Sequence, residues 1–249
     1  MHAELAGKTI LITGAAVGIG KSVAVMLDSF GAKLALVDID LESLLQLKKS
    51  LKNDWHTVYQ FNFKEIHQIE SLVSSVILEN GKLHGYVNCV GIRSRSPLSL
   101  LKPDKIANIL GINFGAVIEM VRCLSQRNRY QDGMSIVSVS SIAATRGSAA
   151  VTAYSASKAA VDAAFRCLAV ELSSKNIRLN TVMPGQTNTP AYSDLMKLAA
   201  SGEDPVLKRQ FLGLAEPEDI ANVIVFLLSE KSRFITGSSI PVDGGFLSS

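Results

Sequence analysis

Short apolar runs alternate with longer amphipathic runs along the whole of this chain. The apolar runs are rich in Val, Ile and Leu, which is typical of strands buried on both faces of a sheet. The longer runs repeat their apolar positions with the spacing of a helix. We predict strands over residues 8–13, 33–38, 57–61, 83–88, 135–139, 177–183 and 239–242, and helices over 18–30, 41–52, 66–79, 105–126, 153–175 and 217–229.

The strict alternation of strands and helices predicts an α/β fold. We expect a doubly wound Rossmann fold around a central parallel sheet of about seven strands. No linker or shift in composition divides residues 1–249, so we predict a single domain. Residues 186–213 show no clear pattern, and a long irregular segment of this kind predicts a loop that binds the substrate.

Composition narrows the classes of function. The chain is 47% hydrophobic and 19% charged with a net charge of +3, and its scattered basic residues do not favour a nucleic-acid partner. We see no signal-peptide pattern and no apolar stretch near the roughly 20 residues of a membrane helix, so we expect a cytoplasmic protein without a membrane partner. Cys89, Cys123 and Cys167 lie in apolar surroundings and are expected to be core residues rather than disulfides or metal ligands.

Glycines occupy the turn between the first predicted strand and the first predicted helix. The sequence T-G-A-A-V-G-I-G places them at Gly14, Gly18 and Gly20. Such a turn lets the backbone approach a pyrophosphate, and the helix N-terminus beyond it offers free N–H groups to an anion. The spacing differs from G-x-G-x-x-G, so this motif alone is also compatible with a plain tight turn.

Asp38 ends the second predicted strand, roughly 20 residues after Gly14. A carboxylate there accepts hydrogen bonds from the adenosine ribose hydroxyls of a dinucleotide and repels a 2′-phosphate. The alternative is that Asp38 or Asp40 only caps the helix beginning near Leu41. Because the glycine turn precedes Asp38 at the spacing expected of a dinucleotide site, we favour the ribose role for Asp38, and with it NAD over NADP.

Tyr154 and Lys158 lie four residues apart in a predicted helix, so their side chains share one face. An ammonium near a phenol favours the phenolate, which can exchange a proton with an alcohol or carbonyl oxygen. Ser141 follows the fifth predicted strand and can polarise the same oxygen, and Asn113 can hold a water beside Lys158. Alone, this Tyr–Lys spacing is common among unrelated helix-surface residues.

Taken together, these motifs resemble the short-chain dehydrogenase/reductase family over about residues 5–245. The glycine turn matches the family pattern T-G-x-x-x-G-I-G at every fixed position. Residues 184–185 match its P-G motif, and residues 242–245 resemble its C-terminal signature. Four residues match the family's catalytic tetrad in order and spacing: Asn113, Ser141, Tyr154 and Lys158.

The resemblance implies reversible hydride transfer between a nicotinamide cofactor and a small secondary alcohol or ketone, without a metal. Tyr154 would be the acid/base, Lys158 would stabilise its phenolate and bind the nicotinamide ribose, and Ser141 would hold the substrate oxygen. Asn113 would belong to a proton relay. The cofactor-binding residues implied are Gly14, Gly18, Ile19, Gly20, Asp38, Asn62, Phe63, Asn88, Gly91, Tyr154, Lys158, Pro184, Gly185, Thr187 and Thr189.

The chain departs from the family pattern at two places near the cofactor. Residues 88–91 read N-C-V-G where the family usually has N-N-A-G. Asn62 stands where an Asp is usual, and its amide oxygen can still accept a hydrogen bond from the adenine amine. NADP-dependent members often carry Arg or Lys where this chain has Val17 and Ile39, which also favours NAD.

Two further functions remain open from the sequence. One is an NADPH-dependent 3-oxoacyl-[acyl-carrier-protein] reductase, and the other is a protein that binds NAD without turnover. Arg93, Arg95 and Arg146 lie near the predicted substrate pocket and suggest an anionic group, with solvated loop arginines as the alternative. The helices that hold Asn113 and Tyr154 are apolar on more than one side, and members of the family typically pair these helices across a two-fold axis. We therefore predict a homotetramer, with a dimer as the alternative.

Overall fold

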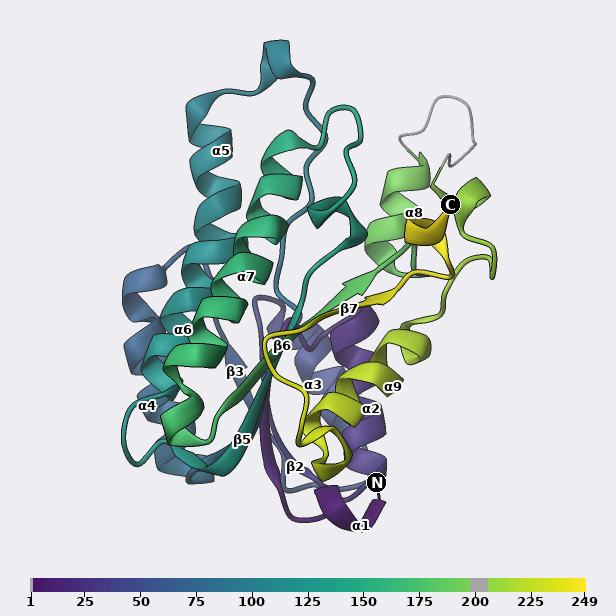
Figure 1. The fold of residues 1–249 in the computed structure, drawn as a ribbon. Helices are drawn as coiled ribbons and strands as arrows, with labels where there is room; N and C mark the ends of the chain where they lie inside the picture. Colours follow the sequence, from purple (N-terminus) through teal and green to yellow (C-terminus); the bar gives the residue numbers. More distant parts are fainter. Residues whose placement is uncertain (1, 198–205) are drawn as a thin grey trace.

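A seven-stranded parallel sheet forms the centre of the computed structural model, which describes residues 2–197 and 206–249 (Figure 1). The strand order is β3-β2-β1-β4-β5-β6-β7, and every neighbouring pair is parallel. The predicted α/β fold class is therefore confirmed. The strands are β1 (Thr9–Thr13), β2 (Lys33–Asp38), β3 (Thr57–Gln60), β4 (Leu83–Asn88), β5 (Tyr130–Val139), β6 (Arg178–Pro184) and β7 (Ser239–Val242).

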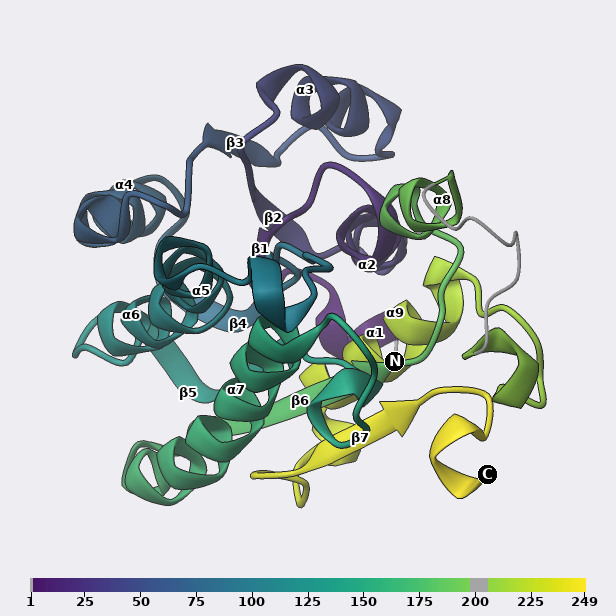
Figure 2. The same cartoon turned by 90° about the horizontal axis from the view of Figure 1, so that it is seen from above.

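Helices cover both faces of this sheet (Figure 2). Each helical layer has its own apolar core, one around Tyr86, Met120 and Phe165 and the other around Leu36 and Ile224. The first layer consists of α4 (Ile69–Asn80), α5 (Pro103–Leu110), α6 (Ala116–Leu124) and α7 (Thr152–Glu171). The second layer consists of α2 (Gly18–Ser29), α3 (Leu41–Ser50) and α9 (Pro217–Leu228), while α1 (His2–Leu5) and α8 (Pro190–Lys197) are shorter.

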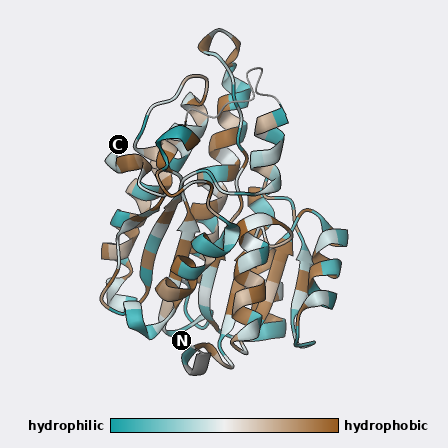
Figure 3. Ribbon diagram, turned by 90° about the vertical axis from the view of Figure 1, so that its right-hand side faces the viewer, coloured by the Kyte–Doolittle hydropathy of each residue, from teal (hydrophilic) through white to brown (hydrophobic). Residues whose placement is uncertain are grey.

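The central strands are apolar without alternation because both of their faces are covered. All five residues of β1 are buried, and the four inner residues of β2 are buried as well. In Figure 3 the strands are mostly brown, and the teal residues lie mainly on outer helix turns and loops. A parallel sheet between two helical layers requires this pattern, since neither face meets water.

The helix predicted over 105–126 consists of three consecutive segments. Its middle segment, Gly111–Gly115, is a π-helical turn between α5 and α6. The turn contains Asn113, which is fully buried and hydrogen-bonded to Ile92 outside the helix. Sequence periodicity does not distinguish a π-turn from an α-helix, although such turns are frequent at functional sites.

One expectation about apolar length was wrong. Within the described residues, the helical run Pro103–Leu124 is long and apolar enough, by length and composition alone, to cross a membrane. Glu119 and Arg122 interrupt its pattern near the end, so the run does not stand out in the sequence. In the structure 44% of its most apolar window is buried inside the protein, and the run packs against α4 and α7.

The stretch 186–213 is more regular than predicted. It contains α8 and a 3₁₀ turn at Leu207–Arg209, while residues 198–205 of the predicted loop lie outside the described residues. Pro190 begins α8, a position where its missing N–H and fixed φ suit a helix. A helix of only eight residues is too short to give a clear periodic signal.

The expectation that all three cysteines are core residues was also wrong. Cys123 is buried and Cys89 is half-buried, but Cys167 is exposed. Cys167 lies on α7 between the buried residues Phe165 and Ala169, so the helical period turns its side chain outward. Its apolar neighbours in the sequence are on the opposite side of the helix.

A buried carboxylate joins α2 to the segment that precedes β3. Asp28 accepts hydrogen bonds from Lys52 N (2.7 Å), from Asn53 N and Nδ2 (3.3 and 2.7 Å), and from His56 Nε2 (2.9 Å). Leu34 N donates to His56 Nδ1 (3.1 Å), which fixes the tautomer in which Nε2 carries the proton. Burial alone raises the pKa of Asp28, but these hydrogen bonds outweigh burial and hold the pKa below its ordinary value.

We predict that Asp28→Asn lowers the free energy of unfolding at pH 7 by about 1–3 kcal/mol, because an amide cannot accept all four hydrogen bonds. The lowered pKa means that the carboxylate stabilises the fold above the unfolded value of about 3.9 and loses this effect as pH falls through the folded value. Urea denaturation should therefore show a constant difference in the free energy of unfolding between the two proteins from pH 7 to 5, and this difference should become smaller below about pH 4. Asp54→Asn, on the exposed neighbour, is the control and should leave stability unchanged.

Candidate active site

A cavity of about 750 Å³ opens at the carboxyl ends of the parallel strands. The strand order reverses between β1 and β4, so the segments after these two strands diverge to opposite sides of the sheet. Segments that follow β1, β2, β4, β5 and β6 all contribute to its walls. The topology alone therefore brings together residues that are far apart in the sequence.

The glycine turn after β1 depends on very close backbone packing. Gly14 has φ +71°, and a Cβ there would lie 2.8 Å from the carbonyl carbon of Cys89. A Cβ on Gly20 would lie 2.0 Å from the Gly14 carbonyl oxygen. Side chains at these positions would separate the turn from β4 and from its own helix, so the first turn of α2 can face the cavity only with glycine.

Asp38 lies at the cavity wall and is not a helix cap. Its Oδ2 accepts from Ala16 N (3.0 Å) and its Oδ1 from Asp40 N (3.2 Å). The N-cap of α3 is Asp40, which accepts from Ser43 N (3.1 Å). The helix-capping alternative therefore applies to Asp40, while Asp38 is held against the glycine turn with lone pairs left for a ligand.

The residues after β3 form one side of the same cavity. Asn62 and Phe63 both line it, as predicted from the sequence. The Asn62 side-chain oxygen accepts a hydrogen bond from Lys64 N (3.1 Å), and Phe63 packs edge to face against Phe61 at 4.9 Å between centroids. The amide group of Asn62 is thus oriented by the backbone that follows it.

Asn88 does not line the cavity, unlike the other residues proposed for the cofactor. It is buried beneath the cavity floor, where its Nδ2 donates to Ser138 Oγ (3.0 Å) and its Oδ1 accepts from Thr13 Oγ1 (3.1 Å). These bonds connect β4 to β1 and β5. Gly91, three residues later, does line the cavity, and a Cβ there would lie 3.1 Å from Lys158 Nζ.

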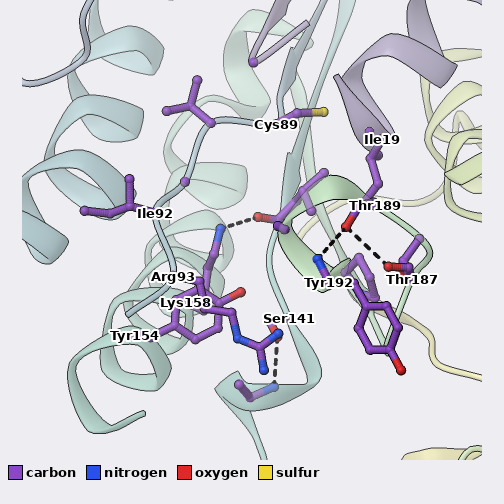
Figure 4. Close-up of a pocket in the computed structure, with 18 of the residues that line it drawn as sticks. Ile19, Cys89, Ile92, Arg93, Ser141, Tyr154, Lys158, Thr187, Thr189 and Tyr192 are labelled. Carbon is purple, nitrogen blue, oxygen red and sulfur yellow. Dashed lines mark hydrogen bonds between the residues drawn. The ribbon is translucent and has the colours of Figure 1, made fainter. Parts of the chain in front are cut away.

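Tyr154 and Lys158 project from α7 into the cavity, as the four-residue spacing predicts (Figure 4). Lys158 is 4% exposed, and its Nζ donates to the carbonyl oxygen of Val139 (2.8 Å) at the end of β5. The same Nζ lies 6.0 Å from the Tyr154 ring centroid. The structure thus places a buried cation, fixed by a backbone acceptor, beside a phenol.

Ser141 faces the same space from the end of β5. Its Oγ accepts from Ala143 N (3.1 Å), which makes it the N-cap of the 3₁₀ turn Ile142–Ala144. No described residue accepts the hydrogen of this hydroxyl, so it can be donated to a bound oxygen. Ser141, Tyr154 and Lys158 all line the cavity.

Asn113 is held differently from the other three tetrad positions. Its Nδ2 donates to Ile92 O (2.9 Å) and Ser157 Oγ (3.0 Å), and its Oδ1 accepts from Ile92 N (2.8 Å). Both N–H donors are therefore used, and the side chain is not among the described residues that line the cavity. Asn113 therefore fixes the backbone of Ile92, and the structure shows no hydrogen bond between Asn113 and Lys158 among the described residues.

The segment after β6 closes the cavity from the other side. Pro184, Gly185, Thr187 and Thr189 line it, and Thr189 Oγ1 accepts from Tyr192 N (3.3 Å) at the start of α8 (Figure 4). Further lining residues come from segments that the sequence singles out: Tyr192, Met196 and Val206 lie within the predicted substrate loop 186–213, and Cys89, Val90 and Ile92 adjoin Asn88 and Gly91. Phe246, near the C-terminus, also lines the cavity, and no local motif predicted it.

A second cluster of polar side chains lies away from the cavity, between α4 and α6. Glu70, Glu119 and Cys123 bring three potential metal ligands together among the described residues. Arg129 and Cys123 donate hydrogen bonds to Glu70, which lowers the pKa of Glu70 to about 2, and Arg122 pairs with both carboxylates. The arginines balance these charges, so the described residues of the cluster form an ion-pair network.

Comparison with known proteins gives consistent matches over the whole chain. A family model described as enoyl-(acyl carrier protein) reductase matches residues 14–247. A 3-oxoacyl-[acyl-carrier-protein] reductase of Thermotoga maritima is 35% identical over 98% of this chain and 99% of that protein, and an L-xylulose reductase of Caenorhabditis elegans is 33% identical over 98% and 97%. The crystal structure of a short-chain dehydrogenase/reductase of Brucella melitensis superposes with a TM-score of 0.91, 30% identity and 99% coverage of both chains.

The packing of the glycine turn gives a direct test. We predict that Gly20→Ala lowers the free energy of unfolding by about 1–3 kcal/mol, because its Cβ would overlap the Gly14 carbonyl. Gly147→Ala is the matched control, since a Cβ at residue 147 meets nothing within 4 Å. Urea denaturation should give a lower free energy of unfolding for Gly20→Ala than for Gly147→Ala, and equal values would contradict the packing described for the turn.

Proposed function

The chain belongs to the short-chain dehydrogenase/reductase family, a family of oxidoreductases, and we propose that it transfers a hydride reversibly between NAD and a small secondary alcohol or ketone. One observation carries the proposal. Ser141, Tyr154 and Lys158 line the same cavity as the glycine turn and Asp38, so catalytic and cofactor-binding groups face one space. Residues 186–213, where described, form its remaining wall.

The residues of this cavity fit an adenine dinucleotide. The glycine turn leaves the N-terminus of α2 open to a pyrophosphate, and a carboxylate stands at the end of β2 for the ribose hydroxyls. The cavity volume lies within the range of cofactor sites. When bound, the nicotinamide ring supplies the acceptor or donor of the hydride.

The protein's own groups would then handle the proton. In the oxidation direction the Tyr154 phenolate takes the hydroxyl proton of the alcohol, and in reduction the phenol returns it to the carbonyl oxygen. Lys158 stabilises the phenolate by its charge, and its bond to Val139 keeps the ammonium in place. Ser141 donates a hydrogen bond to the same oxygen as negative charge develops on it.

The surroundings of Asp38 support NAD over NADP. A carboxylate accepts hydrogen bonds from ribose hydroxyls and repels a 2′-phosphate. The positions where family members that use NADP often carry a cation hold Val17 and Ile39, which are 51% and 60% exposed. Neither side chain can pair with a phosphate.

The second candidate is an NADPH-dependent 3-oxoacyl-[acyl-carrier-protein] reductase, supported by the relative from Thermotoga maritima. An L-xylulose reductase is similar at nearly the same identity, so relationship alone does not select between an acyl and a sugar substrate. Relative rates with NADH and NADPH discriminate between the two candidates. A protein that only binds NAD does not explain why Tyr154, Lys158 and Ser141 converge on one cavity.

We also propose a cytoplasmic homotetramer, with a dimer as the alternative. α7 buries Phe165 and Ala169 on one side and leaves Val170 (77% exposed) and Cys167 exposed on the other. A helix that is apolar on both sides is suited to pairing with another copy.

We predict that Asp38→Ala raises the KM for NAD by roughly 10- to 100-fold, the range expected for losing hydrogen bonds to a charged group. The KM for NADP should change less or fall, because the repelling charge is gone. Asp40→Ala is the control, since it removes only the cap of α3 and should leave the cofactor ratio unchanged. Steady-state kinetics with both cofactors measure this, and an unmodified protein that is at least as efficient with NADPH would overturn the preference.

We predict that Tyr154→Phe lowers kcat by roughly 10²- to 10⁴-fold, as for the loss of a general acid/base, with little change in NAD affinity. Lys158→Ala should weaken both turnover and NAD binding, because it removes the ammonium beside Tyr154, which is also the group expected to bind the nicotinamide ribose. Tyr130→Phe, at the opposite end of β5, is the control. Steady-state kinetics and fluorescence titration with NAD measure these effects, and near-normal turnover of Tyr154→Phe would refute the assignment.

A further inference from the structure

Positive charge dominates the cavity wall away from Asp38. Among the described lining residues the cations there are Arg93, Arg95, Arg146 and Lys158, while Lys64 lies after β3 on the side of Asp38, the single lining carboxylate. Asp38 is held by the glycine turn at the end of β2, on the cofactor side. The space beside Tyr154 is therefore bordered by cations without an acidic partner among the described lining residues.

Arg93 lies on a short arch of backbone that is fixed at both ends. At one end, Asn113 binds the N–H and the carbonyl of Ile92 at 2.8 and 2.9 Å. At the other end, the N–H of Ser96, a buried residue, donates to Ala150 O at 2.7 Å. Only residues 93–95 lie between these points, so the backbone position of Arg93 is fixed by two independent contacts.

The guanidinium of Arg93 lies directly at the catalytic tyrosine. Its Cζ is 5.9 Å from the centroid of the Tyr154 ring, and Figure 4 shows the side chain extending over that ring. The side chain is exposed, and no carboxylate of the described residues pairs with it. At this distance the guanidinium lies beside the ring, and because none of its N–H groups is hydrogen-bonded to a described residue, they are available for a carboxylate.

Arg146 binds the C-terminal turn, so we do not expect it to contact the substrate. Its Nη2 donates to Leu247 O (3.4 Å) and Ser249 O (3.1 Å). These bonds hold the 3₁₀ turn Phe246–Ser248, whose Phe246 lines the cavity. Arg146 therefore supports one wall of the cavity, and Arg93 is the arginine that is both positioned at Tyr154 and free of acidic partners among the described residues.

We propose that the substrate carries a carboxylate within a few bonds of its reacting carbon, and that Arg93 binds this group. The substrate class is then a short hydroxy acid or its oxo acid. Because Arg93 Cζ lies 5.9 Å from the Tyr154 ring centroid, a substrate whose reacting oxygen is held by Tyr154 and Ser141 would have its neighbouring carbons near the guanidinium, whose planar fork matches a carboxylate. This inference rests on the proposed function, since it names the substrate of the same site.

The test compares acids with their methyl esters on the same carbon skeleton. The NADH-dependent reduction of 2-oxobutanoate, 3-oxobutanoate and 4-oxopentanoate is measured beside that of the three esters, for the unmodified protein, Arg93→Ala, Arg93→Lys and Arg127→Ala. At least one acid should exceed its ester in kcat/KM by tenfold or more. Arg93→Ala should raise the KM for that acid by roughly 10- to 100-fold and leave the ester within about threefold.

The two other variants separate charge from geometry. Arg93→Lys should retain part of the preference for the acid, because it keeps the charge but not the fork. Arg127→Ala removes an exposed arginine outside the described cavity wall and should behave like the unmodified protein. If Arg93→Ala leaves the ratio of kcat/KM for acid and ester unchanged, the proposal is wrong. An equal fall in kcat for both substrates would also overturn it, because that result would mean that Arg93 acts on the charge of Tyr154 and not on a substrate carboxylate.

A binding measurement keeps this proposal distinct from the proposed function. Calorimetric titration compares butanoate with butanamide, neither of which can be reduced, in the presence of NADH. Binding of butanoate that is lost in Arg93→Ala and absent for butanamide supports the proposal even if no ketone of the panel is reduced. Reduction of neutral ketones without any preference for acids, or equal binding of the two probes, would overturn the proposal and leave the oxidoreductase function standing.

Discussion

The buried ammonium of Lys158 determines how the walls of the cavity fit together. A buried cation needs a hydrogen-bond acceptor, and the Val139 carbonyl at the end of β5 supplies it. The same ammonium lies close to Gly91, where a Cβ would approach Nζ to 3.1 Å and the lysine would have to shift. Ile92, the next residue, is bound by Asn113 at both its N–H and its carbonyl. Lys158 thus connects α7 to β5 and lies against the segment after β4, which Asn113 in turn ties to the π-turn.

The sequence predicted the parts of the site that local patterns encode. The strand ends at Thr13 and Asp38, the glycine turn, and the Tyr154–Lys158 pair on one helix face all lie where periodicity and spacing put them. Asn88 could not be placed in this way, because whether an Asn at a strand end faces a ligand or its neighbouring strands depends on the register of β1 and β5.

The substrate side of the cavity depends on contacts between distant segments. Gln210, which is buried, accepts from Gln186 N (2.9 Å) and donates to Gln186 O (3.0 Å), and so braces the segment after β6. Arg146 holds the turn that carries Phe246 across about 100 positions of sequence. No periodicity reports such pairs, which is why α8 and the C-terminal wall were not predicted. The glycine turn and Asp38 follow local sequence patterns, whereas the wall formed by the segment after β6 and the C-terminal turn depends on tertiary packing.

The arch that carries Arg93 has a consequence for how this site can diversify. Both of its anchors use backbone atoms of the arch, the N–H and carbonyl of Ile92 and the N–H of Ser96, so they do not depend on which side chains stand between them. The side chains of residues 93–95 can therefore differ while the backbone that holds them beside Tyr154 stays in place. Substitutions at these three positions would change side chains that line the cavity without moving Tyr154, Lys158 or the sheet.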